Sequence, residues 1–259
     1  MDPKTQLKAE TQQTVVFVLA GGKGTRIAEE SSQLPKCLLP IDGGQHLLGR
    51  ALEQLSSAHE WQVVVCCSEE NHSLISASGK ESVANNVRYQ VCRACPLGPL
   101  RALEEVVSSA EATHYLLWLA DLYFFDNPVP AIRQLSSQMV ANGYLVVGDN
   151  VASRDGSGSG YVVASDDGLN EICYRAPGTL APGSTLHRWS GLFLFDRLLA
   201  RDLVAHRDDY AHKALEAWPN DALKRGFALA PFVNVPFVNV NTQTDYALIC
   251  TGPNAAYGN

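Results

Sequence analysis

Val15–Arg26 read VVFVLAGGKGTR, and this stretch decides the fold class. Its first five residues form an unbroken apolar run, which is typical of a strand buried on both faces of a parallel sheet. The glycines that follow let the backbone turn sharply and bring its N–H groups against an oxygen-rich ligand. Lys23 and Arg26 add positive charge at the same place. The stretch therefore predicts a buried strand that ends in an anion-binding loop.

Two common phosphate-binding loops do not fit this stretch. A Walker loop needs a glycine five residues before its Gly-Lys pair, and Phe17 stands at that position. A dinucleotide-binding loop needs a glycine three residues after Gly24, and Ile27 stands there. The loop is therefore neither a P-loop nor a dinucleotide fingerprint.

Beyond the loop, strand and helix patterns alternate along the first half of the chain. Apolar or β-branched runs predict strands at 63–65, 87–91 and 115–119. Apolar residues at helical spacing predict helices at 47–55, 100–110 and around 129–141. Such alternation indicates βαβ units. The predicted fold class is α/β, a Rossmann-like, mostly parallel sheet flanked by helices.

The second half of the chain has a different texture. Residues 153–160, SRDGSGSG, predict a flexible loop. Further elements are expected as strands at 161–164, 172–174 and 192–195, a helical stretch at 197–218 and a strand-like stretch at 232–240. We interpret the short strands as a small β-rich insertion that covers one side of the sheet. The predicted organisation is a flexible tail over 1–13 and a single domain over 14–259.

Composition and charge exclude several classes of protein. A net charge of −7 over 259 residues argues against a protein that wraps nucleic acid, because neutralising phosphates needs a surplus of Lys and Arg. No run approaches the roughly 18 apolar residues that span a bilayer, and the polar start lacks the core of a secretory signal. Seven cysteines in such a chain predict reduced thiols and a cytoplasmic location. The C-x-x-C of Cys92 and Cys95 has no second pair that would make a zinc site.

A second motif, Leu34–Ile41 reading LPKCLLPI, follows the loop closely. LAGGKGTR followed by LPKCLLPI resembles the signature of the sugar-phosphate nucleotidyltransferase superfamily, within the nucleoside-triphosphate transferases. The resemblance implies a Mg²⁺-dependent enzyme that joins a nucleoside monophosphate, taken from a nucleoside triphosphate, to a phosphorylated small molecule and releases pyrophosphate. The acceptor it favours is a sugar 1-phosphate.

The resemblance assigns nucleotide-binding and catalytic roles to residues of these motifs. Arg26, assisted by Lys23, would stabilise the leaving pyrophosphate, and Lys36 would contact the phosphates near the reacting centre. Leu97–Leu100, reading LGPL, resembles a segment beside the nucleobase, which Gly98 would contact through its backbone. The implied nucleotide-binding residues are Leu19, Ala20, Gly21, Gly22, Lys23, Gly24, Thr25, Arg26 and Gly98.

A carboxylate at the end of a predicted strand marks the candidate metal site. Asp121 follows the apolar run 117–120, and ligands of open α/β sheets bind at that edge. The family holds Mg²⁺ with an Asp at this place, so the resemblance makes Asp121 both catalytic and a metal ligand. Phe237–Thr242 resembles the family's second metal motif and leaves two alternatives, Asn239, which we prefer, and Asn241. An amide oxygen is an acceptable ligand for a hard cation.

The β-rich insertion would cover the acceptor side. Gly160 and Tyr161 resemble one acceptor-pocket strand of the family, and Ser190 and Gly191 resemble another. Arg175 stands where many relatives have a Glu that reads sugar hydroxyls, so its positive charge either holds the acceptor phosphate or faces solvent.

Two other functions fit the same residues. One is transfer to a non-sugar acceptor, of the molybdenum-cofactor, phosphocholine or phosphonate type. The other is a non-catalytic regulatory subunit that keeps the fold. The expected partners are a nucleoside triphosphate and a phosphorylated small molecule, without nucleic acid or membrane. The sequence leaves the nucleobase, the acceptor and the formation of a homo-oligomer open.

Overall fold

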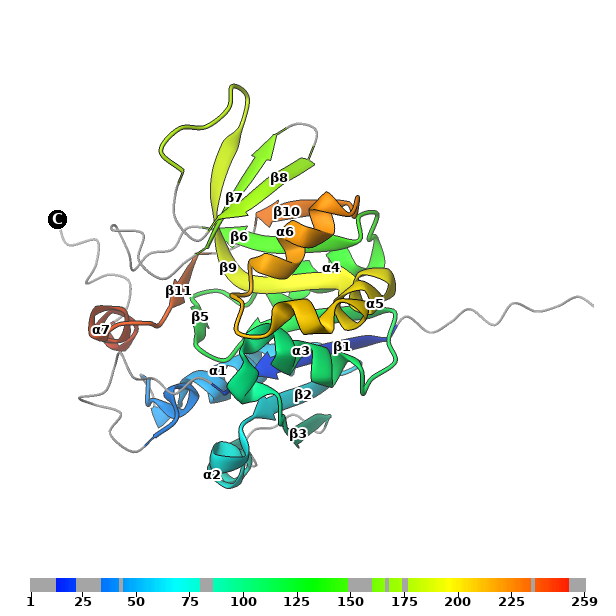
Figure 1. Cartoon of the computed structure of the whole chain (residues 1–259). Helices are drawn as coiled ribbons and strands as arrows, with labels where there is room; N and C mark the ends of the chain where they lie inside the picture. Colours follow the sequence, from blue (N-terminus) through cyan, green and yellow to red (C-terminus); the bar gives the residue numbers. More distant parts are fainter. Residues whose placement is uncertain are drawn as a thin grey trace, which may run out of the picture.

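The computed structural model shows helices packed on both faces of a central sheet (Figure 1). It describes residues 13–21, 34–41, 44–79, 86–148, 160–165, 168–173, 177–233 and 236–251. The predicted flexible tail at 1–13 lies outside these ranges except for Gln13. The predicted loop at 153–160 also lies outside them, except for Gly160.

The main sheet confirms the predicted α/β class. Across the described chain its path runs β10-β6-β9-β4-β1-β2-β3. The bounds are β1 Thr14–Leu19, β2 Gln62–Cys67, β3 Val87–Val91, β4 His114–Leu119, β6 Gly143–Gly148, β9 Thr185–Asp196 and β10 Leu229–Val233. Four pairs along the path are parallel, and β9 is antiparallel to both β4 and β6.

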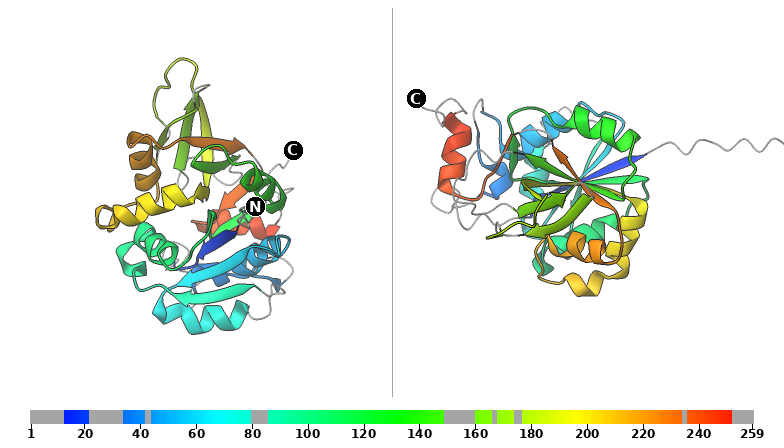
Figure 2. Two further views of the ribbon diagram at one scale, coloured as in Figure 1. Left: turned by 90° about the vertical axis from the view of Figure 1, so that its right-hand side faces the viewer. Right: turned by 90° about the horizontal axis from the view of Figure 1, so that it is seen from above.

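Helices cover both faces of the sheet, which explains why its central strands are apolar throughout. The bounds are α1 Leu47–Leu55, α2 Glu69–Gly79, α3 Pro99–Val107, α4 Val129–Ser137, α5 Arg197–Ala205, α6 Ala217–Lys224 and α7 Gln243–Thr251. Val15 and Phe17 of β1 face a cluster that includes α3, α5 and α6, whereas Val16 and Val18 face α1, α2 and α4. Figure 2 shows these two helical layers. No helix in the described ranges combines the length and apolar character needed to cross a bilayer.

Four short strands complete the architecture. β7 (Gly160–Ser165) and β8 (Gly168–Cys173) form a hairpin, and β7 pairs with the first half of β9. This hairpin is the small β-rich insertion, and it projects from the main sheet in Figure 1. β5 (Leu122–Phe124) and β11 (Phe237–Asn239) form a separate antiparallel pair. The pair aligns Asn239 with Leu122, next to Asp121.

The boundaries of several elements differ from those predicted. The strand expected at 192–195 is the end of the 12-residue β9, which is long because it pairs with β7 and then with β4 and β6. The stretch expected as one strand at 232–240 supplies β10 and β11, which belong to different sheets. The helical stretch at 197–218 contains α5, the 3-10 turn η5 (Arg207–Tyr210) and the start of α6. Long-range pairing, which a local pattern does not report, sets these limits.

A buried ion pair joins α5 to α6. Arg225 donates hydrogen bonds of 2.8 and 2.6 Å to the carboxylate of Asp202, whose side chain is 5% exposed. The indole of Trp218 donates to the same carboxylate at 3.2 Å, and Arg225 also donates to the hydroxyl of Tyr210. These contacts fix the segment between η5 and α6, which forms one wall of the cavity described below.

We predict that Asp202→Ala lowers the free energy of unfolding by about 3 kcal/mol, because it leaves a partly buried guanidinium without its anion. Urea unfolding of the two proteins measures the difference. Asp208→Ala is the matched control, since that carboxylate is 87% exposed and its loss should change stability little. Equal stabilities of the Asp202 and Asp208 variants would contradict the assignment.

Candidate functional site

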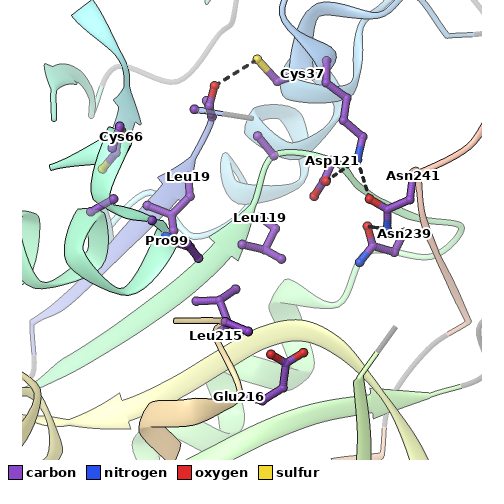
Figure 3. Close-up of a pocket in the computed structure, with 18 residues that line it drawn as sticks. Leu19, Cys37, Cys66, Pro99, Leu119, Asp121, Leu215, Glu216, Asn239 and Asn241 are labelled. Atoms are coloured by element: carbon purple, nitrogen blue, oxygen red, sulfur yellow. Dashed lines mark hydrogen bonds and ion pairs between the residues drawn. The ribbon is translucent and has the colours of Figure 1, made fainter. Parts of the chain in front are cut away.

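A cavity of about 440 Å³ lies where the parallel strands β1, β2 and β4 end (Figure 3). Ligands of open α/β sheets bind at this edge. Its walls come from β1, β2, α3, the β4–β5 turn, the segment before α6, and β11. The lining residues are Leu19, Ala20, Gly21, Lys36, Cys37, Cys66, Cys95, Gly98, Pro99, Ala102, Leu119, Ala120, Asp121, Ala214, Leu215, Glu216, Asn239 and Asn241.

The ammonium group of Lys36 joins two of the predicted metal-site residues. It lies 2.6 Å from Oδ2 of Asp121 and 2.8 Å from Oδ1 of Asn241. The side chain of Lys36 is 10% exposed and that of Asp121 is 26% exposed. Lys36 opens the 3-10 turn η2 (Lys36–Leu38) directly after Pro35, and the buried residues of this turn anchor it. A buried charge is stable only when it is paired, so Lys36 and Asp121 depend on each other.

Backbone contacts hold Asp121 at the mouth of the sheet. The amide of Ala120 donates to the carbonyl of Leu19 at 3.0 Å, which continues the β1–β4 ladder up to the carboxylate. The amide of Val240 donates to the carbonyl of Asp121, also at 3.0 Å. The ends of β4 and β11 are thereby tied together, as the prediction of a shared site requires.

The two candidate amide ligands have different orientations. Asn241 directs Oδ1 at Lys36 and donates through Nδ2 to Oδ1 of Asn239 at 2.9 Å. The carboxylate of Asp245 accepts from the backbone amides of Asn241 and Thr242, and the amide of Asp245 donates to the Thr242 hydroxyl. This reciprocal cap at the start of α7 fixes the backbone of Asn241.

The oxygens that surround the Lys36 ammonium fit a divalent ion. Asp121 and Asn241 already direct oxygen atoms at one cation, and Asn239 adds an oxygen beside them. Carboxylate and amide oxygens are the ligands that Mg²⁺ accepts. In the described ranges, this site included, no group of three His, Cys, Asp or Glu residues could hold a metal, so the candidate ligands here are one acid and two amides.

Gly98 shapes the opposite end of the cavity. It has a φ of 103°, a conformation that residues with a side chain rarely adopt, and it precedes Pro99 at the start of α3. The amide of His212 donates to the carbonyl of Leu97 at 2.6 Å, so the segment after η5 packs against this turn. The backbone amide of Gly98 itself donates to the carbonyl of Cys95.

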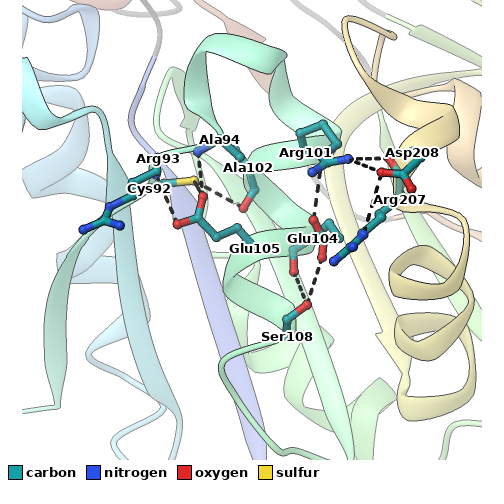
Figure 4. Close-up of polar contacts among 10 residues, drawn as sticks. All are labelled: Cys92, Arg93, Ala94, Arg101, Ala102, Glu104, Glu105, Ser108, Arg207 and Asp208. Carbon is teal, nitrogen blue, oxygen red and sulfur yellow. Dashed lines mark hydrogen bonds and ion pairs between the residues drawn. The ribbon is translucent and has the colours of Figure 1, made fainter.

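Cys95, the second cysteine of the C-x-x-C, lines the cavity near Gly21, and Figure 4 shows the surroundings of the first, Cys92. The thiol of Cys92 donates to Glu105 at 3.1 Å, and Glu105 also accepts from the amides of Arg93 and Ala94. A second side-chain hydrogen bond, between Cys92 and Cys95, lowers the pKa of Cys95, against the opposing effect of burial. The same hydrogen bond, then burial, raises the pKa of Cys92. A side chain at Gly21 would approach Sγ of Cys95 to 3.2 Å, so glycine keeps the loop close to this sulfur.

The structure brings together some of the predicted residues. Leu19, Ala20, Gly21, Lys36, Gly98, Asp121, Asn239 and Asn241 line one cavity. Residues 22–26, including Lys23 and Arg26, and Arg175 lie outside the described residues. Their predicted roles stay predictions.

The four described acceptor residues do not line this cavity. Ser190 is buried, donates to the carbonyl of Val146 at 2.8 Å and accepts from the amide of Leu192. Gly191 has a φ of 97°, and a Cβ there would lie 2.6 Å from Leu119. Both residues therefore have a structural role, because they allow β9 to pack against its neighbours. Tyr161 stacks under the guanidinium of Arg188.

Several residues of the cavity carry no signal in the sequence. Glu216, with Ala214 and Leu215, comes from an irregular segment far along the chain. Cys66 is the penultimate residue of β2 and could have been found from the rule that ligands bind at the carboxyl ends of parallel strands. Cys95 was noted only for its C-x-x-C spacing.

Comparisons with known proteins agree with this geometry. The model of the MobA-like NTP transferase domain matches residues 16–221. The inositol-1-phosphate CTP transferase from T. maritima has a TM-score of 0.75 at 16% identity, over 91% of this chain and 92% of that one. A putative glucose-1-phosphate thymidylyltransferase from Bacillus anthracis has a TM-score of 0.73 at 17% identity, over 90% and 92% of the two chains.

A third structural neighbour is HddC from Yersinia pseudotuberculosis. Its TM-score is 0.67 at 21% identity, over 92% of this chain and 98% of that one. HddC has also been solved in complex with GMP-PN. No curated protein sequence matches this chain significantly. Likeness at such identities shows a shared fold.

We predict that Cys95 is alkylated by iodoacetamide faster than Cys66, although both line the cavity, because burial raises the pKa of Cys66. Peptide mass spectrometry at intervals, between about pH 6 and pH 9, measures both rates. In Cys92→Ala the pH midpoint for Cys95 should rise, since the hydrogen bond to its thiolate is lost. An unchanged midpoint would remove Cys92 as the cause.

Proposed function

Because this chain belongs to the family of MobA-like NTP transferase domains, we propose that it transfers a nucleoside monophosphate from a nucleoside triphosphate to a sugar 1-phosphate or a similar hydroxylated phosphate. The observation that carries the proposal is the Lys36–Asp121–Asn241 cluster, which lies in the same cavity as the start of the glycine loop. The buried lysine and its carboxylate partner at this cavity favour an enzyme over a regulatory subunit, because phosphoryl transfer depends on charge compensation.

The proposed reaction needs no nucleophilic side chain. A phosphate oxygen of the acceptor attacks the α-phosphorus in line, the bond to the β-phosphate breaks, and pyrophosphate leaves. Since two polyanions repel each other, the work of the protein is positioning and charge compensation. Lys36 would contact the phosphates at the reacting centre, and Arg26 with Lys23 would stabilise pyrophosphate.

We assign the Mg²⁺ site to Asp121 together with Asn241 or Asn239. Oδ1 of Asn241 points at the ammonium group of Lys36, which Asp121 also contacts. This orientation supports Asn241 over Asn239, the residue that the sequence favours. When bound, Mg²⁺ would neutralise phosphate charge and hold the two substrates together. Asp245 would keep Asn241 in register through its backbone cap.

The short hairpin β7–β8 supports a sugar-type acceptor, because the resemblance implies that the smaller molybdenum-cofactor guanylyltransferases lack such an insertion. We also propose a cytoplasmic location, because all seven cysteines are free thiols. Acceptors of the molybdenum-cofactor, phosphocholine and phosphonate types are the competing possibilities.

The decisive experiment is a pyrophosphate-release assay with the four ribonucleoside triphosphates and dTTP, each against a panel of acceptors. The panel contains glucose 1-phosphate, mannose 1-phosphate, myo-inositol 1-phosphate, phosphocholine and 2-aminoethylphosphonate. We expect Mg²⁺-dependent turnover with a sugar or cyclitol phosphate. Nucleotide binding without any turnover would favour the regulatory subunit, and turnover of phosphocholine alone would move the function to the non-sugar class.

We predict that Asp121→Ala abolishes turnover while the fold is retained. Among the described residues that we propose as metal ligands, Asp121 is the only acid, so the variant loses the negative charge that would hold the ion. Lys36→Ala should lower kcat by about 10²-fold or more, the scale seen when one electrostatic stabiliser is removed.

The matched control for both variants is Asp126→Ala. Asp126 follows β5 in the same segment but is exposed and does not line the cavity. It should keep full activity. Circular dichroism and thermal unfolding establish that each variant is folded. Near-normal Mg²⁺-dependent activity of a folded Asp121→Ala protein would refute the metal assignment.

A further inference from the structure

Glu216 is the charged residue of the cavity that the proposed reaction does not use. It immediately precedes α6 as the N-cap residue, yet its side chain does not cap the helix. Within the described residues its carboxylate makes no hydrogen bond and no ion pair, while Asp121, the other acid of the cavity, is paired with Lys36. Glu216 is partly buried. A carboxylate in such a place gains stability when a ligand donates a hydrogen bond to it.

The position of Glu216 separates it from the proposed phosphate-binding end. In Figure 3, Leu119 and Leu215 lie between Glu216 and Asp121, and Cys66 and Pro99 lie on the other side of the cavity. A Cβ at Gly160 would lie 3.3 Å from Oε1 of Glu216, so the carboxylate reaches the start of the β7–β8 hairpin. That hairpin is the insertion that the sequence predicts on the acceptor side.

The charge of Glu216 restricts what it can contact. A carboxylate repels phosphate groups, so the triphosphate and the acceptor phosphate belong at the Lys36 end. The part of a ligand that reaches Glu216 must be neutral or cationic and must carry a hydrogen-bond donor. Quaternary ammonium groups are usually recognised by aromatic faces, and none of the described residues that line this cavity is aromatic. Among neutral donors, the hydroxyl groups of a sugar or cyclitol phosphate fit these surroundings.

We propose that Glu216 selects the acceptor by accepting a hydrogen bond from a hydroxyl group on its non-phosphate body. The inference rests on the proposed transferase function and names the residue that reads its second substrate. It also gives Gly160 a role in acceptor binding that does not require direct contact. A side chain there would press on both Glu216 and the ring of Trp189, which lies 3.2 Å from the same Cβ position.

The test compares wild-type protein with Glu216→Gln, which keeps the shape and removes the charge. The acceptors are the active sugar or cyclitol phosphate of the panel and its single-deoxy analogues, with pyrophosphate release as the readout. We expect Glu216→Gln to lower kcat/KM for the acceptor by about 10-fold, because the hydroxyl then donates to a neutral instead of a charged acceptor. The KM for the nucleoside triphosphate and the thermal midpoint should not change.

The deoxy analogues distinguish contact from a general effect of charge. For the wild type, one analogue should lose about as much kcat/KM as the variant does, because it lacks the hydroxyl that Glu216 reads. Glu216→Gln should discriminate that analogue from the parent compound less than the wild type does. Glu70→Gln, on the exposed face of α2, is the control for removing a carboxylate and should behave as wild type.

The outcomes separate this inference from the proposed function. An active wild type whose acceptor kcat/KM is the same in Glu216→Gln overturns the role of Glu216 and leaves the transferase intact. If only phosphocholine or 2-aminoethylphosphonate is turned over, and Glu216→Gln loses that activity, then Glu216 contacts a cationic group of the acceptor. That result overturns the inference that Glu216 contacts a hydroxyl group. A wild type that binds nucleotide but turns over no acceptor rejects the function and the inference together.

Discussion

The contact of one ammonium group with a carboxylate and an amide organises the functional end of this molecule. Lys36, Asp121 and Asn241 are far apart in the sequence, and each comes from a different element. The 3-10 turn after Pro35, the end of β4 and the segment after β11 must all be in place before these three groups can meet. Because an unpaired buried charge is costly, the contact favours the one arrangement of the three segments in which the cavity is complete.

The arrangement also gives the cavity two chemically different ends. Near Lys36 and Asp121 the groups are charged, and they are held by a capped turn and by backbone hydrogen bonds. Toward Cys66, Cys95 and Pro99 the wall is small and less polar, and a positive-φ glycine bends the chain out of the way. A nucleotide has the same division between its phosphates and its base. The family match confirms the resemblance to NTP transferases that the sequence indicates, and the structural neighbours share the fold.

The sequence predicted the parts of the fold that depend on local patterns. The apolar run of β1 was sufficient for a buried parallel strand, and the position of Asp121 was predictable because a carboxylate after such a run lies at the ligand-binding edge. The direction and length of β9 were not predictable, because an apolar run does not state which strands will pair with it. Glu216 was missed for a related reason. Glu216 lies in the cavity only because η5 and α6 fold back against Gly98 and Gly160, and a local pattern does not report such long-range contacts.

The pairing of β5 with β11 has a consequence for how the protein is made. Domains form from the N-terminal side as the chain emerges during synthesis, and β1, β2 and β4 can associate early. Asn239 and Asn241 emerge much later, and only then can the β5–β11 ribbon close. A nascent chain can therefore bury a large part of its core before the proposed metal site is complete, so that assembly of the core and completion of the cavity are separate events in its biogenesis.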